Sequence, residues 1–190
     1  WFSHDFPPYW SFVALAISAF VAGFVVGPLL ERFMLRPQYD KDEVVILLIT
    51  YGLFLILEDV LKMIWGVDPY FVSEPYELLG MFEVGEMIYP RYYLLMIGLA
   101  ITVGLALLLL LKKTKFGRIL VAVIHDREIS AAMGVNVGFV FAITFGLGCS
   151  LAALAGGFTA PTISVTPGLG VEVIVLSFAV VVTGGLGSLP

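Results

Sequence analysis

Residues that could take part in chemistry are few in this chain, and the clearest group is Glu58, Asp59 and Lys62. Glu58 and Lys62 are spaced i, i+4, the order in which an acid and a base stabilise a helix. They would lie roughly 21 Å along a helix beginning at Val44, near one membrane surface, where charged side chains reach the interface. A structural anchor is the favoured interpretation, and a place at the mouth of a transport pathway is the alternative.

A second candidate is Glu172, which follows the glycine-containing segment 167–170 and precedes an apolar run. An acid at the start of a helix complements the helix dipole, which is the favoured interpretation. The alternative is a contact to a substrate ammonium group, because glycine-rich breaks can create half-helix ends that attract charged substrate groups. The candidate residues of a substrate pathway are therefore Glu172, Gly168, Gly170, Gly184 and Gly185.

Catalytic and cofactor sites are not predicted. His125 and Asp126 have the types of a metal-dependent phosphohydrolase pair, but the other histidine, His4, is expected on the opposite side of a membrane. The glycines at 184–187 lack the Lys and Ser/Thr that complete a phosphate-binding loop. A single cysteine, Cys149, can form neither a disulfide nor a cysteine metal site within the chain. We expect no catalytic residues, no metal and no cofactor, so any ATPase must be another chain.

The composition is that of an integral membrane protein. Hydrophobic residues make up 60% of the chain and charged residues 13%, with a mean hydropathy of +1.03. Unbroken Leu, Val and Ile runs without a ten-residue alternating pattern indicate helices, each needing about 20 residues to cross a bilayer. The predicted fold is all-α and polytopic, with about five transmembrane helices at 11–30, 44–65, 92–111, 139–160 and 171–184.

Charges between these segments predict the orientation, because Lys and Arg are retained on the cytoplasmic side. Basic residues gather in the connectors 31–43 and 112–138, which should be cytoplasmic. The connector 66–91 is acidic and should lie outside, together with residues 1–10. The net charge of −5 describes mainly that outer face and gives no support for nucleic acid binding.

The connector 112–138 contains a short predicted helix. Asp126 suits its N-cap and Gly134 its C-terminal stop. Ile129, Ala132 and Met133 fall at i, i+3 and i+4 and share one face. The remaining polar positions, Arg127, Glu128 and Ser130, are expected to meet water or a partner. A capped helix beneath a membrane is typical of a docking surface.

Two predicted spans carry small residues at four-residue spacing, and such ridges let helix backbones approach closely. The positions are Ala19, Gly23 and Gly27 in the first span and Gly148, Ala152 and Gly156 in the fourth. Packing within one subunit is favoured over a subunit interface, because the motif is common in polytopic proteins.

Several motifs together resemble a known family. They include TKFGRILVAVIHDREISAAMGVN at 114–136, FAVVVTGGLGSLP at 178–190, and the segments 27–37, 141–148, 152–157 and 160–161. In this order they closely resemble the permease subunits of branched-chain amino acid ABC importers. The resemblance is strongest over the last eighty or so residues, and the outer connector 66–91 departs from the family in being unusually acidic and aromatic.

The resemblance implies a transport permease of a prokaryotic plasma (inner) membrane, with ATP hydrolysis performed by a separate subunit. Its partners would be cytoplasmic ATP-binding subunits, a second permease subunit (identical or homologous), an extracytoplasmic substrate-binding protein and the lipid bilayer. Residues 1–190 would form a single permease domain, truncated at both ends. The helix that fits the ATPase would consist of Asp126, Arg127, Glu128, Ile129, Ala132, Met133 and Gly134.

Other functions stay open at this point. Related permeases carry urea or short amides. A stand-alone secondary transporter or channel would predict inverted repeats and a paired ionisable relay in mid-membrane, which the sequence does not present. A membrane scaffold or receptor would use the cytoplasmic helix to recruit a signalling protein without moving a solute.

Overall fold

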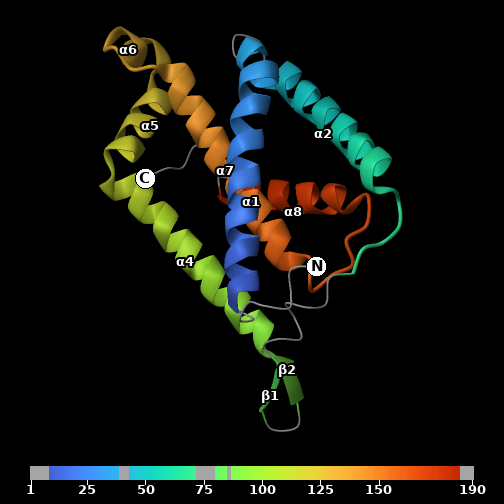
Figure 1. Ribbon diagram of the computed structural model, residues 1–190. Helices are drawn as coiled ribbons and strands as arrows, with labels where there is room; N and C mark the ends of the chain where they lie inside the picture. The colour runs from blue at the N-terminus through green and yellow to red at the C-terminus, as the bar shows by residue number, and fades with distance from the viewer. Residues whose placement is uncertain (1–8, 39–42, 72–79, 85–86, 185–190) are drawn as a thin grey trace. The chain divides into compact units, whose positions relative to one another are not determined.

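The structure is a computed structural model that describes residues 9–38, 43–71, 80–84 and 87–184. Within these ranges the chain is almost entirely helical (Figure 1), as the sequence predicts. The α-helices are α1 (Tyr9–Leu30), α2 (Glu43–Trp65), α4 (Arg91–Lys113), α5 (Lys115–His125), α6 (Arg127–Ala132), α7 (Val137–Thr159) and α8 (Leu169–Gly184). They fall into two compact units, one of residues 1–40 and 73–162 and the other of 41–72 and 163–190.

Three helical segments of the described chain have the length and apolar composition of a membrane span: Phe12–Gln38, Arg91–Lys113 and Val137–Thr159. The helix α8 is shorter, at 16 residues, and α2 carries Glu58, Asp59 and Lys62 near its end. The α-helical, multi-pass membrane fold is thereby confirmed, whereas the crossing of the bilayer by α2 and α8 stays a prediction.

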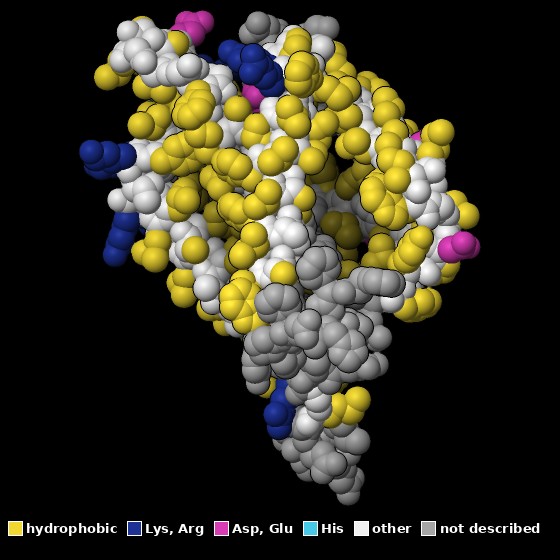
Figure 2. All heavy atoms as spheres, viewed as in Figure 1, with side chains coloured by type: hydrophobic (Ala, Val, Ile, Leu, Met, Phe, Trp, Pro, Cys, Tyr) yellow, Lys and Arg dark blue, Asp and Glu magenta, His cyan; other side chains and the backbone are white. Residues whose placement is uncertain are grey.

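Exposed hydrophobic side chains follow the length of α4, as lipid contact requires. Leu94, Ile97, Ile101, Leu105 and Leu108 recur every three or four residues and are each more than half exposed. In Figure 2 the hydrophobic side chains are spread over the helices, while Lys and Arg side chains are confined to a few places, one of them the end of α4 that leads into α5. A continuous exposed apolar surface of this kind would be unfavourable in water and is suited to contact with lipid.

The helices α1 and α7 form the main packing contact of the first unit (Figure 1). A Cβ atom at Gly23 would lie 2.5 Å from Ser150 Cα, and one at Gly27 would lie 2.7 Å from Gly146 Cα. The ridge of α1 predicted from its small residues therefore packs within the chain. Such backbone proximity replaces the hydrophobic effect, which cannot drive association between helices in lipid.

The ridge predicted on α7 does not take part in this contact. Among the described residues, a Cβ atom at Gly148 or Gly156 would meet open space. The helix instead uses Gly146 and Ser150, and Gly157 lies beside Leu15 of α1. Small residues occur on more than one face of α7, so their spacing alone does not select the face that packs.

The segment after α1 is more regular than the expected connector 31–43. It continues as a π-helix, Glu31–Leu35, and a 3-10 helix, Arg36–Gln38. The Arg36 guanidinium lies beside the backbone of Gly138, where a Cβ atom would be 2.8 Å from its nitrogen. This contact fixes the end of the α1 segment against the start of α7.

The N-terminal end of α4 is held by Tyr92, which is fully buried. Its hydroxyl donates a 2.7 Å hydrogen bond to the carbonyl oxygen of Phe158 in α7, and its ring lies 6.4 Å from that of Phe12 in α1. Just before α4, β1 (Met81–Val84) and β2 (Met87–Pro90) pair as an antiparallel hairpin. The sequence did not predict this hairpin.

The second unit joins α2 to the segment that leads into α8. Tyr70 and Val165 exchange two backbone hydrogen bonds of 3.0 Å. A Cβ atom at Gly170 would lie 2.7 Å from Cε2 of Phe54, so only glycine lets the first turn of α8 reach this ring without displacing it. Gly168 has a φ of +101°, a conformation that glycine adopts readily.

Candidate functional site

The connector 112–138 contains a further helix, α5, before the predicted short helix. Thr114 caps its start, the hydroxyl accepting a 3.1 Å hydrogen bond from the Gly117 amide. Gly117 lies so close to the carbonyl oxygens of Leu110 and Leu111 that a side chain there would overlap them. Glycine at this position therefore permits the abrupt change of direction from α4 to α5.

One face of α5 anchors the connector to α7. Leu120 and Val123 are buried with Val140 of α7, and further apolar side chains surround this cluster. Ile119, Val121 and Ile124 of the same helix are exposed. Leu120 and Val123 are three residues apart, so they lie on the same face of α5 and both pack against α7.

The short helix α6 occupies the position predicted from its caps. The Asp126 carboxylate accepts a 2.9 Å hydrogen bond from the Ile129 amide at the first turn. At the other end Gly134 has a φ of +86°. Its amide bonds the Ala131 carbonyl and the Val135 amide bonds the Ser130 carbonyl, a Schellman motif.

The exposed side of α6 carries two large apolar side chains. Ile129 is 60% exposed and Met133 is 80% exposed, and Ala132 and Glu128 also face outward. The side chains of Ile129 and Met133 lie together on one face of a capped helix, so we expect a binding partner to bury them. The arrangement suits a docking contact.

One polar residue of α6 lies differently from the sequence expectation. Ser130, predicted to meet water or a partner, is buried, and its hydroxyl donates a 2.7 Å hydrogen bond to the Asp126 carbonyl. Arg127 is exposed, as expected, and its guanidinium also lies 5.0 Å from the ring centroid of Phe141 in α7, a cation–π contact. Helical spacing alone reveals neither the burial of Ser130 nor the contact between Arg127 and Phe141.

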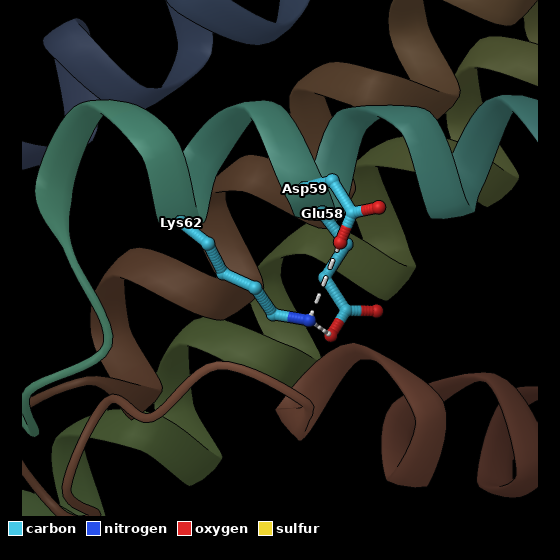
Figure 3. Close-up of polar contacts among 3 residues, drawn as sticks. All are labelled: Glu58, Asp59 and Lys62. Carbon is cyan, nitrogen blue, oxygen red and sulfur yellow. Dashed lines mark ion pairs between the residues drawn. The ribbon is translucent and has the colours of Figure 1, made fainter.

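A second candidate site is a cavity in the second unit, here called the α2–α8 pocket. It has a volume of about 610 Å³ and is lined by Phe54, Leu57, Glu58, Leu61, Lys62, Trp65, Gly66, Asp68, Tyr70, Val165, Thr166, Pro167, Gly168 and Gly170. Lys62 Nζ lies 2.8 Å from Glu58 Oε1 and 3.6 Å from Asp59 Oδ1 (Figure 3). The exposed fractions are 17% for Glu58 and 34% for Lys62.

The structure separates the candidate pathway residues. Gly168 and Gly170 line the α2–α8 pocket beside Glu58 and Lys62, which were interpreted mainly as an anchor. Glu172 is exposed and is not part of the pocket lining, and Gly184 ends α8. Gly185 is outside the described residues. No sequence signal could bring Glu58 next to Gly168, since the residues are remote in the chain.

The fold and the connector define the class: a multi-pass membrane protein whose spanning helices are joined to a short capped helix. A family model described as "Branched-chain amino acid transport system / permease component" matches residues 1–190. The chain therefore belongs to this family of transport-system permeases.

Named relatives agree with this assignment. The chain is similar to the high-affinity branched-chain amino acid transport system permease protein BraD of Pseudomonas aeruginosa, with 26% identity over 93% of this chain and 60% of the relative. It is also similar to the permease protein LivH of Escherichia coli K12, with 27% identity over 95% of this chain and 60% of the relative. The chain thus spans about 60% of the length of these relatives. No solved structure matches it.

Proposed function

We propose that the chain is part of the permease subunit of an ATP-driven importer for branched-chain or related amino acids, in the inner membrane of a prokaryote. The observation that carries the proposal is α6, which is capped at both ends and presents Ile129 and Met133 outward. In this account α6 docks on a cytoplasmic ATP-binding subunit, which hydrolyses ATP. A second permease subunit and an extracytoplasmic substrate-binding protein complete the importer.

The contacts around α6 explain how a small helix could transmit force. Asp126 and Gly134 fix its two ends, so that it moves as one body. Arg127 rests on Phe141 of α7, and α5 is packed on the same helix through Val140. A displacement of α6 by the ATPase would therefore be passed to α7, and through its glycine contacts to α1.

The orientation follows from the same account. The segments 31–43 and 112–138 would be cytoplasmic, and 66–91 would be outside. Substrate would then pass near the glycine-rich breaks of α8, with Gly168, Gly170, Glu172, Gly184 and Gly185 as candidates along the pathway.

The test is uptake of labelled leucine by the full-length permease reconstituted in liposomes with its ATPase and binding protein. ATP-dependent uptake is expected, and none without the ATPase. Uptake by the permease alone, driven by an ion gradient, would refute the proposal in favour of a secondary transporter. The variant Glu172→Gln in the same assay is expected to lower uptake, and unchanged uptake would remove Glu172 from the pathway.

A further inference from the structure

The lining of the α2–α8 pocket combines opposite charges with apolar walls. Glu58 and Asp68 contribute carboxylates and Lys62 an ammonium group, while Phe54 and Leu61 contribute apolar surface. Pockets that bind small molecules typically have this mixture, with a few polar groups that orient the ligand against hydrophobic walls. The cavity volume of about 610 Å³ is in the usual range for such pockets.

The two central charges are placed for a ligand that itself carries both signs. Glu58 Oε1 and Lys62 Nζ lie only 2.8 Å apart, and both side chains are partly exposed. An ammonium and a carboxylate on adjacent atoms of a ligand could each bond the group of opposite sign, replacing one ion pair by two charge-assisted hydrogen bonds. A neutral amide could contact the same two groups, but through weaker hydrogen bonds, because it brings no charge of its own.

The wall beside the ion pair is shaped by the start of α8. Gly170 allows Phe54 to lie against the first turn, and the bridge between Tyr70 and Val165 holds that turn near α2. An aliphatic side chain could therefore be covered by Phe54, Leu57 and Leu61 while its charged end stays at Glu58 and Lys62.

We propose that the α2–α8 pocket binds a zwitterionic α-amino acid with an apolar side chain. The ligand ammonium contacts the Glu58 carboxylate, the ligand carboxylate contacts the Lys62 ammonium, and the side chain lies against Phe54 and its aliphatic neighbours. The inference rests on the proposed function, and it gives the permease chain an amino acid site of its own, separate from that of the binding protein.

The chain offers a matched control for the test. Asp59 is adjacent to Glu58 on the same helix and also carries a carboxylate, but its contact to Lys62 Nζ is longer, at 3.6 Å, it is 76% exposed and it is not among the residues lining the pocket. The experiment measures leucine binding by saturation-transfer NMR to the full permease complex with its ATPase in nanodiscs, without the binding protein. Glu58→Gln and Lys62→Met are expected to weaken binding about tenfold or more, because each removes a charged hydrogen bond, and Asp59→Asn to have a much smaller effect, because it alters only the longer, exposed contact to Lys62.

Ligand analogues distinguish direct contact from a structural effect. 4-Methylpentanoate lacks the ammonium group of leucine and isoamylamine lacks its carboxylate, so both should bind the wild-type complex weakly. Glu58→Gln should reduce the preference for leucine over 4-methylpentanoate, and Lys62→Met the preference over isoamylamine. A purely structural ion pair would weaken all three ligands in parallel.

The proposal is overturned if the wild-type complex does not bind leucine, if Asp59→Asn weakens binding as much as Glu58→Gln, or if urea or acetamide competes as well as leucine. The failure of this proposal can be distinguished from the failure of the proposed function. Normal ATP-driven leucine uptake by the wild type together with unaltered binding in Glu58→Gln would leave the permease assignment standing and remove only the pocket.

Discussion

The ends of α6 depend on one side chain and one backbone conformation. The Asp126 carboxylate satisfies an amide that the first helical turn leaves without a partner, and Gly134 adopts a φ of +86° that terminates the helix. Both features depend on residues within a few positions, so the sequence alone could predict them. The burial of Ser130 and the contact of Arg127 with Phe141 depend on how α6 packs in the fold. They could not be predicted from the sequence alone.

At this scale we predict the effect of removing the cap. Asp126→Ala deletes the 2.9 Å hydrogen bond to the Ile129 amide and should destabilise α6 by about 1 kcal/mol. Hydrogen exchange of the α6 amides in the full-length subunit should become roughly fivefold faster. Asp126→Asn, which keeps an acceptor oxygen, serves as the control. Equal exchange in the wild type and Asp126→Ala would show that the cap does not hold the helix.

At the scale of the elements, glycine positions decide which helices approach. Gly23 and Gly27 bring α1 against α7, Gly117 turns α5 from α4, and Gly170 admits Phe54 beside α8. The helices themselves were predictable, because their apolar runs are continuous in sequence. The packing face of α7 and the α2–α8 pocket were not, because contacts between distant segments define them, whereas the cap of α5 at Thr114 is a local signal.

The α1–α7 contact gives a matched pair of substitutions. Gly23→Ala places a methyl group 2.5 Å from Ser150 Cα and should force the helices apart, whereas Gly148→Ala enters open space among the described residues. We expect Gly23→Ala to lower the thermal unfolding temperature of the detergent-purified subunit by several degrees, as an overpacking cost of about 1–3 kcal/mol implies. Gly148→Ala should leave it within about a degree. The same unfolding temperature for both variants would contradict the described packing.

At the scale of the whole molecule, membership of the permease family and the charge distribution together predict the orientation in the membrane. Met133 lies in the connector that should be cytoplasmic, and Met81 lies in the hairpin that should be outside. Both side chains are exposed, at 80% and 63%. They are therefore suitable reporters of sidedness.

The orientation can be read by cysteine labelling in the full-length protein after Cys149→Ala. A membrane-impermeant maleimide should modify Met133→Cys only in inside-out vesicles and Met81→Cys only in right-side-out vesicles. Labelling of both positions from one side would reject the predicted topology, because the chain between them would then cross the membrane an even number of times.

The measurement that tests the central claim most directly is affinity purification of the full-length subunit from native membranes in mild detergent, followed by quantification of copurifying ATP-binding subunits. Met133→Asp introduces a charge on the exposed apolar face of α6, and Met81→Asp makes the same change at an exposed methionine of the hairpin. We predict that the wild type and Met81→Asp retain the ATPase and that Met133→Asp loses most of it. Equal recovery from all three would contradict docking through α6, and the absence of any ATPase from the wild type would contradict the importer itself.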